Sequence, residues 1–406
     1  MYTTIEVILN LTKKITFLIL ATFLLFSCKS TQVQKEETLP PVELEPTQKD
    51  ITLLFGGDLM AHTVNYNITD YAKIWKDITP LVQKSDLAFA NIEAPIDTTK
   101  KASTWPNFNM TYNYVNAAIT AGFNVFSLCN NHTNDQGLTG IQETAKTTKA
   151  LQTAAKNQNK EIYFSGLKNA PKDKFSYNLI EKNGWKILFL PITELLNRPD
   201  FSEYINYSRP TVEQRQNIIS LCKELKEKTK CDLFIFSLHT AEPEYTREIT
   251  GAQEEYYQNL LKAGVDIVWA NHAHIIKDRK FVFNSKNQSQ KLIMYANGNT
   301  ISGQRTAPDF VSKNPIGERD NTGDGLLYEV TLTKKKENDK TIVSIKKAQP
   351  YFITTYINTA NEYVIKFLNK DFVNYLYDVN RKNWAEYIKR RIKINEIATK
   401  DLIVWQ

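Results

Sequence analysis

The sequence predicts an α/β protein in which buried strands alternate with helices. Short apolar runs recur along the chain, and most are followed by a segment with the apolar spacing of an amphipathic helix. Gly, Pro, Asn and Asp residues stand at the ends of these runs, where turns are expected. The runs are numerous enough for two sheets packed against each other. The 406 residues allow one large domain or two smaller ones.

In the first half, apolar runs closed by polar or turn-forming residues predict strands at 51–55, 86–90, 123–128, 161–164 and 186–190. Apolar residues at helical spacing predict helices at 70–83, 112–121 and 138–156. Gly122 stands directly after the second of these helices, as a residue that ends a helix commonly does.

The second half continues the alternation. It predicts helices at 211–228 and 252–263, the latter closed by Gly264, and strands at 232–238, 265–270 and 291–296. Segments 323–333 and 341–347 are typical of edge or hairpin strands. The tail after Asn358 has apolar residues at helical spacing, so we expect a helical C-terminal extension over 359–406 that packs on a domain spanning 51–358.

The N-terminus has the pattern of a secretory signal. Lys13-Lys14 precedes the apolar run 15–26, which is short for a membrane span. Leu25-Phe-Ser-Cys28 resembles a bacterial lipobox, so we expect a lipoprotein signal over 1–28 with Cys28 as the lipidated residue; an ordinary cleaved signal is the alternative. The polar, Pro-containing segment 29–50 is typical of a flexible tether. These features indicate a lipid-anchored cell-envelope protein, periplasmic or at the outer-membrane surface.

The composition and charge distribution argue against a nucleic-acid-binding protein and against a disulfide-rich one. The formal net charge is +7, but the basic residues are scattered and form no arm or aromatic–basic motif, so we expect no nucleic-acid partner. Cys129, Cys222 and Cys231 do not form a disulfide framework. Cys222 and Cys231 could pair, although buried free thiols are the simpler interpretation.

The chemically informative residues follow the predicted strands. Each of five strands ends in polar side chains that can bind metals or anions: Asp58; Asn91 with Glu93; Asn131 with His132; His239; and His272 with His274. All five histidines of the chain lie in these polar segments or, for His62, four residues after Asp58. Ligands of open α/β sheets bind at the carboxyl ends of the strands, so these side chains are expected to converge.

Imidazole, carboxylate and amide groups suit a divalent transition metal such as Mn²⁺, Fe²⁺ or Zn²⁺. His272 and His274 are two residues apart, so both would face one site if the chain stays extended there. Asp58 and His239 could complete a metal site, and His132 or Glu93 would then be free for acid–base chemistry. Asp135 and Gly137 fit a turn into the next helix.

In this order the motifs resemble the CapA-type family of poly-γ-glutamate capsule biosynthesis, over about residues 51 to 330. They are Gly57-Asp58, Asn91-Ile92-Glu93, Asn130-Asn131-His132 with Asp135 and Gly137, His239 with Glu244-Tyr245, His272-Ala273-His274, Gly298-Asn299, Gln304-Arg305 and Thr322-Gly323-Asp324-Gly325. The resemblance implies a metallophosphatase-like, four-layer α/β/β/α sandwich. It also implies one or two metal ions held by Asp58, Asn131, His239, His272 and His274.

The resemblance further implies catalytic roles for His132 and Glu93, and substrate contacts from Asn91, Asn130, Glu244, Asn299 and Arg305. The first loop departs from the metallophosphatase pattern. It reads Asp58-Leu59-Met60, where that pattern has Asp-x-His, and His62 comes two residues later. The glycine before the His-x-His motif is replaced by Asn271.

Three functions remain open at this point. The first is a metal-dependent hydrolase or transferase that acts on an anionic envelope polymer or its precursor. The second is a non-catalytic envelope protein that binds a polyanionic polymer in the same cleft. The third is a structural partner in a capsule-synthesis complex, docked through aromatic residues of the C-terminal helices.

Overall fold

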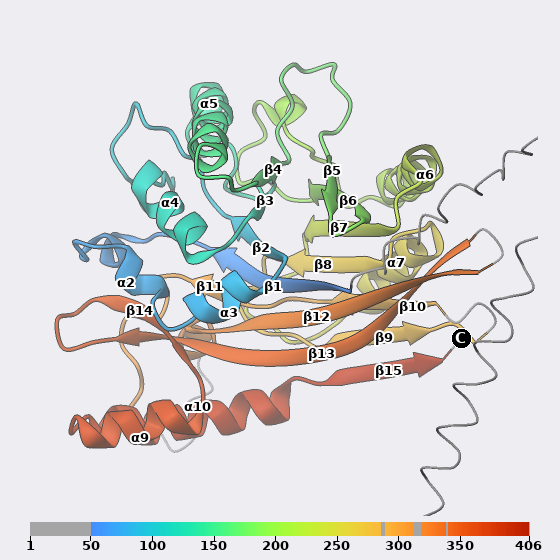
Figure 1. Ribbon diagram of the computed structural model, residues 1–406. Helices are drawn as coiled ribbons and strands as arrows, with labels where there is room; N and C mark the ends of the chain where they lie inside the picture. Colours follow the sequence, from blue (N-terminus) through green and yellow to red (C-terminus); the bar gives the residue numbers. More distant parts are fainter. Residues whose placement is uncertain (1–49, 286–288, 312–317, 338–339, 406) are drawn as a thin grey trace, which may run out of the picture. The chain divides into compact units, whose positions relative to one another are not determined.

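The computed structural model describes residues 50–285, 289–311, 318–337 and 340–405, which form two β-sheets covered by helices (Figure 1). All of the described residues belong to one compact unit. The expected signal, nearly all of the tether and the expected lipidation site Cys28 lie outside the described residues. In the part of the chain that is described, no helix is both long and apolar enough to cross a membrane.

The first sheet has eight strands in the order β14-β13-β12-β1-β2-β3-β4, with β11 paired to β1. Strands β1 to β4 run parallel, whereas β12 to β14 form an antiparallel extension along β1. The strands are β1 (Ile51–Leu59), β2 (Leu87–Ile92), β3 (Val125–Ser127), β4 (Tyr163–Ser165), β11 (Asn299–Ile301), β12 (Asp324–Glu337), β13 (Lys340–Ile357) and β14 (Tyr363–Phe367).

The second sheet has seven strands in the order β15-β9-β10-β8-β7-β6-β5. Its centre, from β6 to β10, is parallel, so the carboxyl ends of β6, β7 and β8 share one edge. The strands are β5 (Asn178–Lys182), β6 (Trp185–Thr193), β7 (Leu233–His239), β8 (Ile267–Asn271), β9 (Arg279–Phe283), β10 (Gln290–Met294) and β15 (Asp401–Trp405).

The two sheets pack face to face through a buried aromatic layer. Phe55 of β1 stacks on Phe89 of β2 with ring centroids 4.6 Å apart, and both contact Trp269 of β8. The indole Nε1 of Trp269 donates a hydrogen bond of 2.9 Å to the carbonyl of Gly56 in the opposite sheet. This bond joins β1 to β8 near the carboxyl ends of both strands, where the site described below is formed.

Helices cover the outer faces of both sheets. The apolar sides of α2 (Ala72–Trp75), α3 (Thr79–Lys84), α4 (Tyr112–Ala121), α5 (Gly137–Lys156), α9 (Lys370–Asp378) and α10 (Lys382–Ala398) contribute to the core on the first sheet. Those of α6 (Val212–Thr229) and α7 (Gly251–Lys262) pack on the second sheet. The short helices are η1 (Thr63–Tyr66), η2 (Ser202–Tyr204) and α8 (Glu318–Asn321). The predicted α/β/β/α sandwich is confirmed.

Several elements differ from the sequence prediction. The helix expected over 70–83 is split into α2 and α3, because Pro80 in the first turn of α3 favours a new helix start there. The extension expected to be helical contains α9 and α10, but β14 precedes them and β15 follows them. β5, β9 and β11 were also not expected. Because β14 and β15 belong to different sheets, the C-terminal segment contributes to both.

A buried ionic network attaches α10 to the start of β12. The carboxylate of Asp324 accepts hydrogen bonds from Arg305 (2.5 Å), Arg391 (2.7 Å) and Asn395 (2.7 Å). Burial raises the pKa of Asp324, but the charges of Arg305 and Arg391 outweigh burial and hold it below its usual value. Tyr387 of α10 donates a further 2.7 Å hydrogen bond to Asp320. The C-terminal helix is therefore held against the loop that leads into β12.

We predict that Asp324→Asn lowers the free energy of unfolding by about 3 kcal/mol, because two buried guanidinium groups lose their counter-charge. Urea unfolding at neutral pH measures the loss. The matched control is Asp378→Asn on the exposed end of α9, which should change stability by less than about 0.5 kcal/mol. An equal effect of both substitutions would contradict this account.

The free energies of unfolding of the parent and of Asp324→Asn should depend differently on pH. A carboxyl group whose folded-state pKa is depressed stabilises the protein above its unfolded pKa, and this contribution is lost as the pH falls through the folded pKa. The difference between parent and Asp324→Asn should therefore be full at neutral pH and shrink below about pH 4, where the unfolded carboxyl protonates. A difference that grows on acidification would contradict the direction assigned to Asp324.

Candidate metal centre

Five buried side chains meet where the carboxyl ends of the two sheets face each other. We call them the histidine–carboxylate cluster: Asp58 of β1, Glu93 after β2, His239 at the end of β7, and His272 and His274 after β8. The Nε2 atoms of His239 and His274 lie 3.7 and 3.6 Å from Oε1 of Glu93. Nδ1 of His274 lies 3.3 Å from Oδ2 of Asp58. The structure thus brings these predicted residues together.

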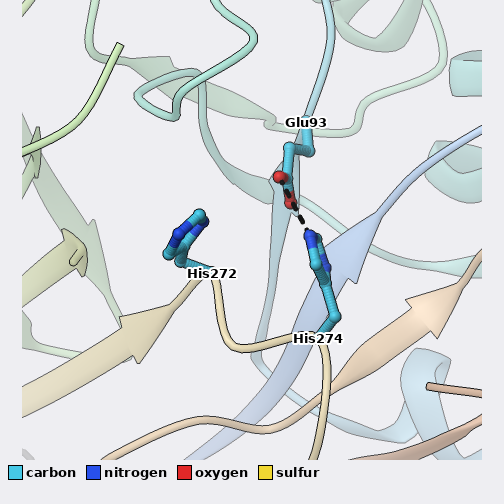
Figure 2. A group of neighbouring side chains, drawn as sticks. All are labelled: Glu93, His272 and His274. Carbon is cyan, nitrogen blue, oxygen red and sulfur yellow. Dashed lines mark ion pairs between the residues drawn. The ribbon is translucent and has the colours of Figure 1, made fainter. Parts of the chain in front are cut away.

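Glu93 is at the centre of the cluster. Figure 2 shows its carboxylate opposite the imidazoles of His272 and His274. In each of two groups, one potential ligand atom per residue lies within 4.8 Å of the others: Glu93, His272 and His274, and Asp58, Glu93 and His239. Since Glu93 belongs to both groups, it could bind one ion or lie between two.

The carboxylate of Glu93 is fully buried, and neither oxygen has a hydrogen-bond partner among the described residues. Burial, followed by the charges of Asp58 and Glu244, raises the pKa of Glu93 well above its usual value. Oδ1 of Asn91, beside Asp58, is likewise buried without a partner. Unpaired buried oxygens are costly unless a cation or a proton compensates them, so this donor set fits a bound divalent metal.

The histidines differ in their preferred charge. Burial, reinforced by neighbouring histidines, lowers the pKa of His239 well below its usual value and that of His272 to about 4. These two imidazoles are neutral at pH 7, which is the form that binds metals. For His274, the opposing hydrogen bond and charge of Asp58 outweigh burial and raise the pKa. A proton on His274 would therefore compete with a metal ion.

The chain does not stay extended over 272–274. β8 ends at Asn271, and φ is +100° at His272 and +54° at His274, so the chain turns sharply there. Positive φ is uncommon for residues other than glycine and costs about 1–3 kcal/mol where it occurs. The turn nevertheless directs both imidazoles toward Glu93, as Figure 2 shows.

His132 lies beside the cluster in a second, hydrogen-bonded pair. Its Nδ1 lies 2.7 Å from Oδ2 of Asp135, which also accepts a hydrogen bond of 2.7 Å from the backbone of Phe108. A carboxylate only accepts hydrogen bonds, so Nδ1 carries the proton and Nε2 keeps its lone pair. The side-chain nitrogen of Asn197 lies 3.2 Å from Nδ1 and 3.4 Å from Nε2 of the same ring. From the sequence, Asp135 was expected only in a turn, and Asn197 was not expected at the site. The spacing His-x-x-Asp was the available signal for the pair of His132 and Asp135.

Of the remaining predicted site residues, Asn91, Asn131, Asn299 and Glu244 lie beside the cluster, whereas Asn130 and Arg305 do not contact it. Asn91 donates to Asp58 (2.8 Å), Asn299 lies 3.0 Å from Nδ1 of His274, and Asn131 lies 2.8 Å from Nε2 of His239. These three amides orient the cluster. Glu244 lies 3.9 Å from Nε2 of His272 and is partly exposed.

Asn130 and Arg305 are used elsewhere in the structure. The amide of Asn130 donates to the carbonyl of Ile92 at 2.7 Å and shapes the loop before His132. Arg305 is buried and paired with Asp324, and it does not line the cleft beside the cluster. The structure therefore does not bring Arg305 to the other predicted substrate contacts.

A cleft of about 550 Å³ opens onto the cluster. It is lined by residues from eight segments of the chain: Met60, His62, Trp105, Pro106, Asn107, Phe108, Asn131, His132, Asn197, Arg198, Glu244, Tyr245, His274, Gln304 and Arg319. A larger depression of about 900 Å³, lined by residues within 83–86, 119–124 and 156–162 and by Lys182, contains none of the predicted site residues. A ligand of the cluster would enter through the cleft.

Two sheets between helices, with histidines and carboxylates gathered at the strand ends, define a class of protein: an α/β/β/α sandwich with a candidate metal centre at its strand ends. Within it, the chain belongs to the bacterial capsule synthesis protein PGA_cap family, whose model matches residues 52–304. It is 27% identical to the capsule biosynthesis protein CapA of Bacillus anthracis, over 78% of this chain and 75% of that protein. It is 24% identical to the PGA biosynthesis protein CapA of Bacillus subtilis, over 62% of this chain and 63% of that protein.

Two solved structures are distantly similar. A hypothetical protein from Thermus thermophilus has a TM-score of 0.42 and 17% identity, covering 74% of this chain and 98% of its own. The calcineurin-like phosphoesterase YfkN from Bacillus subtilis has a TM-score of 0.39 and 11% identity, covering 84% of this chain and 99% of its own. At these scores neither structure supports a conclusion about this chain.

We predict that Asp135 fixes the tautomer of His132. In protein labelled with ¹⁵N-histidine, the long-range proton–nitrogen spectrum should assign the neutral His132 proton to Nδ1, and Asp135→Asn should weaken that preference, because an amide no longer requires a donor at Nδ1. Exposed Asp173→Asn is the control and should leave the His132 signals unchanged. A parent spectrum with the proton on Nε2 would refute the assignment.

Proposed function

We propose that this protein is a metal-dependent hydrolase or transferase in the biosynthesis of a capsule or other envelope polymer of the poly-γ-glutamate kind. The observation that carries the proposal is the buried, unpartnered carboxylate of Glu93 among three histidines. The names of the two relatives, capsule biosynthesis protein and PGA biosynthesis protein, support the polymer class.

The cluster would hold one or two divalent ions through Asp58, Glu93, His239, His272 and His274, with Asn131 as a further oxygen donor. Imidazole and carboxylate ligands suit Mn²⁺, Fe²⁺ or Zn²⁺. A bound ion of this kind polarises a substrate carbonyl or phosphoryl oxygen and acidifies water. Glu93 is thereby assigned to the metal rather than to proton transfer, because its oxygens lie between the histidines and not beside open space.

His132 is the residue suited to moving a proton. The hydrogen bond from Nδ1 to Asp135 leaves Nε2 as an acceptor, and the ring lines the cleft. Nε2 can take a proton from an attacking group and return it to a leaving group, while Asp135 stabilises the charged ring. Glu244, partly exposed near His272, is placed to contact a bound substrate.

The alternative is a non-catalytic protein that binds a polyanionic polymer in the same cleft. One observation favours it. Met60 occupies the position where metallophosphatases have a histidine, and its side chain is buried in the core of the first sheet, so it adds no ligand. A cluster with fewer ligands could bind a metal for structure alone.

We further propose that the protein acts in the bacterial cell envelope, anchored through a lipid on Cys28 and a tether over 29–50. The sequence pattern around Cys28 supports this placement. A capsule-synthesis complex is the setting in which such a protein would meet its polymer. Metabolic labelling with a fatty acid should tag the parent but not Cys28→Ala, and an unlabelled parent would contradict the anchor.

We predict that the purified protein binds Mn²⁺ or Zn²⁺ and that Glu93→Gln and His239→Ala each weaken the affinity at least tenfold, because every ligand contributes to the site. Titration calorimetry measures the affinity, and the unfolding midpoint should rise with metal in the parent but much less in the variants. The matched control, exposed Glu248→Gln, should bind metal as the parent does. Parent-like affinity in Glu93→Gln would refute the metal centre.

A turnover assay distinguishes the metal-dependent enzyme from the non-catalytic polymer-binding protein. We predict that the metal-loaded protein hydrolyses a γ-glutamyl amide or a generic phosphodiester, and that His132→Ala lowers kcat by about 10²–10⁴-fold while metal affinity stays at the parent value. Liquid chromatography of the products measures the rate. Metal binding without turnover of either substrate class would favour the non-catalytic polymer-binding protein.

A further inference from the structure

His62 is held firmly on the wall of the cleft. Its Nδ1 accepts a 3.1 Å hydrogen bond from the backbone of Gly303, and its ring meets the ring of Phe108 edge to face at 5.0 Å. A side chain at position 303 would lie 2.7 Å from Cβ of His62 and 2.5 Å from Val64, so glycine is required for this contact. The imidazole is therefore fixed by one loop and one aromatic ring.

The hydrogen bond from Gly303 also determines what His62 can do. Since Nδ1 accepts, the neutral ring must carry its proton on Nε2. Burial, with the nearby charges of His274 and Arg319, lowers the pKa of His62 to about 4, so the ring is neutral at pH 7. Among the described residues, none accepts a hydrogen bond from Nε2. His62 thus offers a donor in the cleft, whereas His132 offers an acceptor there.

Arg319 lies on the same cleft. It is exposed on α8, and its guanidinium has no ion pair or hydrogen bond within the described ranges. His62 and Tyr245 line the same cleft, and the positive charge of Arg319 acts to lower the pKa of both. Arg198, the other arginine of the cleft, instead pairs with Asp200 at 2.8 Å. A guanidinium with free donors in a cleft matches a carboxylate or phosphate.

We propose that His62 and Arg319 form a subsite for an anionic group, a carboxylate or a phosphate, of the ligand that reacts at the histidine–carboxylate cluster. That a reaction follows at the cluster rests on the proposed function. The binding of an anionic group by His62 and Arg319 does not depend on it. Because His274 and His132 line the same cleft, an anionic group held by His62 and Arg319 places the adjoining part of the ligand beside the cluster. The subsite would select ligands whose anionic groups recur along a chain.

The test measures binding without turnover. The full chain, with Mn²⁺ present, is titrated with a short γ-linked glutamate oligomer, with the same oligomer after amidation of its carboxylates, and with inorganic phosphate. Arg319→Gln should weaken binding of the charged probe about tenfold or more, because charge-assisted hydrogen bonds are lost. His62→Phe, which keeps a ring against Phe108, should weaken it by a smaller factor, and neither variant should change binding of the amidated oligomer.

Conservative variants and a remote control exclude a loss caused by misfolding. Arg319→Lys and His62→Gln keep a donor and should recover part of the affinity. Exposed Arg209→Gln makes the same charge change as Arg319→Gln outside the cleft and should bind as the parent does. Metal content and the unfolding midpoint of each variant should match the parent.

The binding results for the two probes distinguish a carboxylate subsite, a phosphate subsite and no subsite. Weakening confined to the glutamate oligomer identifies a carboxylate subsite, and weakening confined to phosphate identifies a phosphate subsite. Parent-like affinity of Arg319→Gln and His62→Phe for both probes overturns the proposal, as does a parent that binds neither probe. Binding that depends on Arg319 without any turnover would contradict the enzymatic function and leave the subsite standing.

Discussion

The constraint that organises the site is the burial of the Glu93 carboxylate beside that of Asp58. Two carboxylates in a protein interior repel each other, and each loses its solvation by water, so the arrangement is stable only with compensating charge. The surrounding side chains do not supply it fully, since Asn91 donates to Asp58 but no described residue donates to Glu93. A divalent cation, or a proton on Glu93, would supply the positive charge that this pair of buried carboxylates requires.

Support for the cluster extends to the end of the chain. Asn299 contacts His274 and also donates a 2.9 Å hydrogen bond to the carbonyl of Thr322. Two residues further, Asp324 is held by the buried guanidinium of Arg391 in α10. The last helix therefore stabilises the loop that positions a cluster histidine. The C-terminal segment thus supports the site in addition to contributing a strand to each sheet.

Much of the fold and site could be predicted because the signals are local. Buried strands such as 232–238 are continuous apolar runs, and parallel strands bring their carboxyl ends to one edge, which is why His239 and His272 could be expected to meet. Pairings between distant segments leave no such local signal. β15 joins β9 through Asp401 and Arg279, which are far apart in sequence. Likewise, the glycine-rich motif around Arg305 gave no sign that Asp324 would bury its charge.

The first loop shows why a missing motif residue is not simply a missing function. β1 has irregular register on both sides of Asp58, and the chain then turns so that Met60 enters the core, with its carbonyl accepting from Tyr114 at 3.1 Å. The imidazole two residues later faces the cleft, where Gly303 occupies its Nδ1. A nitrogen that accepts a backbone hydrogen bond cannot also ligate a metal, and the protonated Nε2 has no lone pair to offer. The loop therefore offers a hydrogen-bond donor to the cleft and no metal ligand from His62, which fits the proposed subsite beside the cluster.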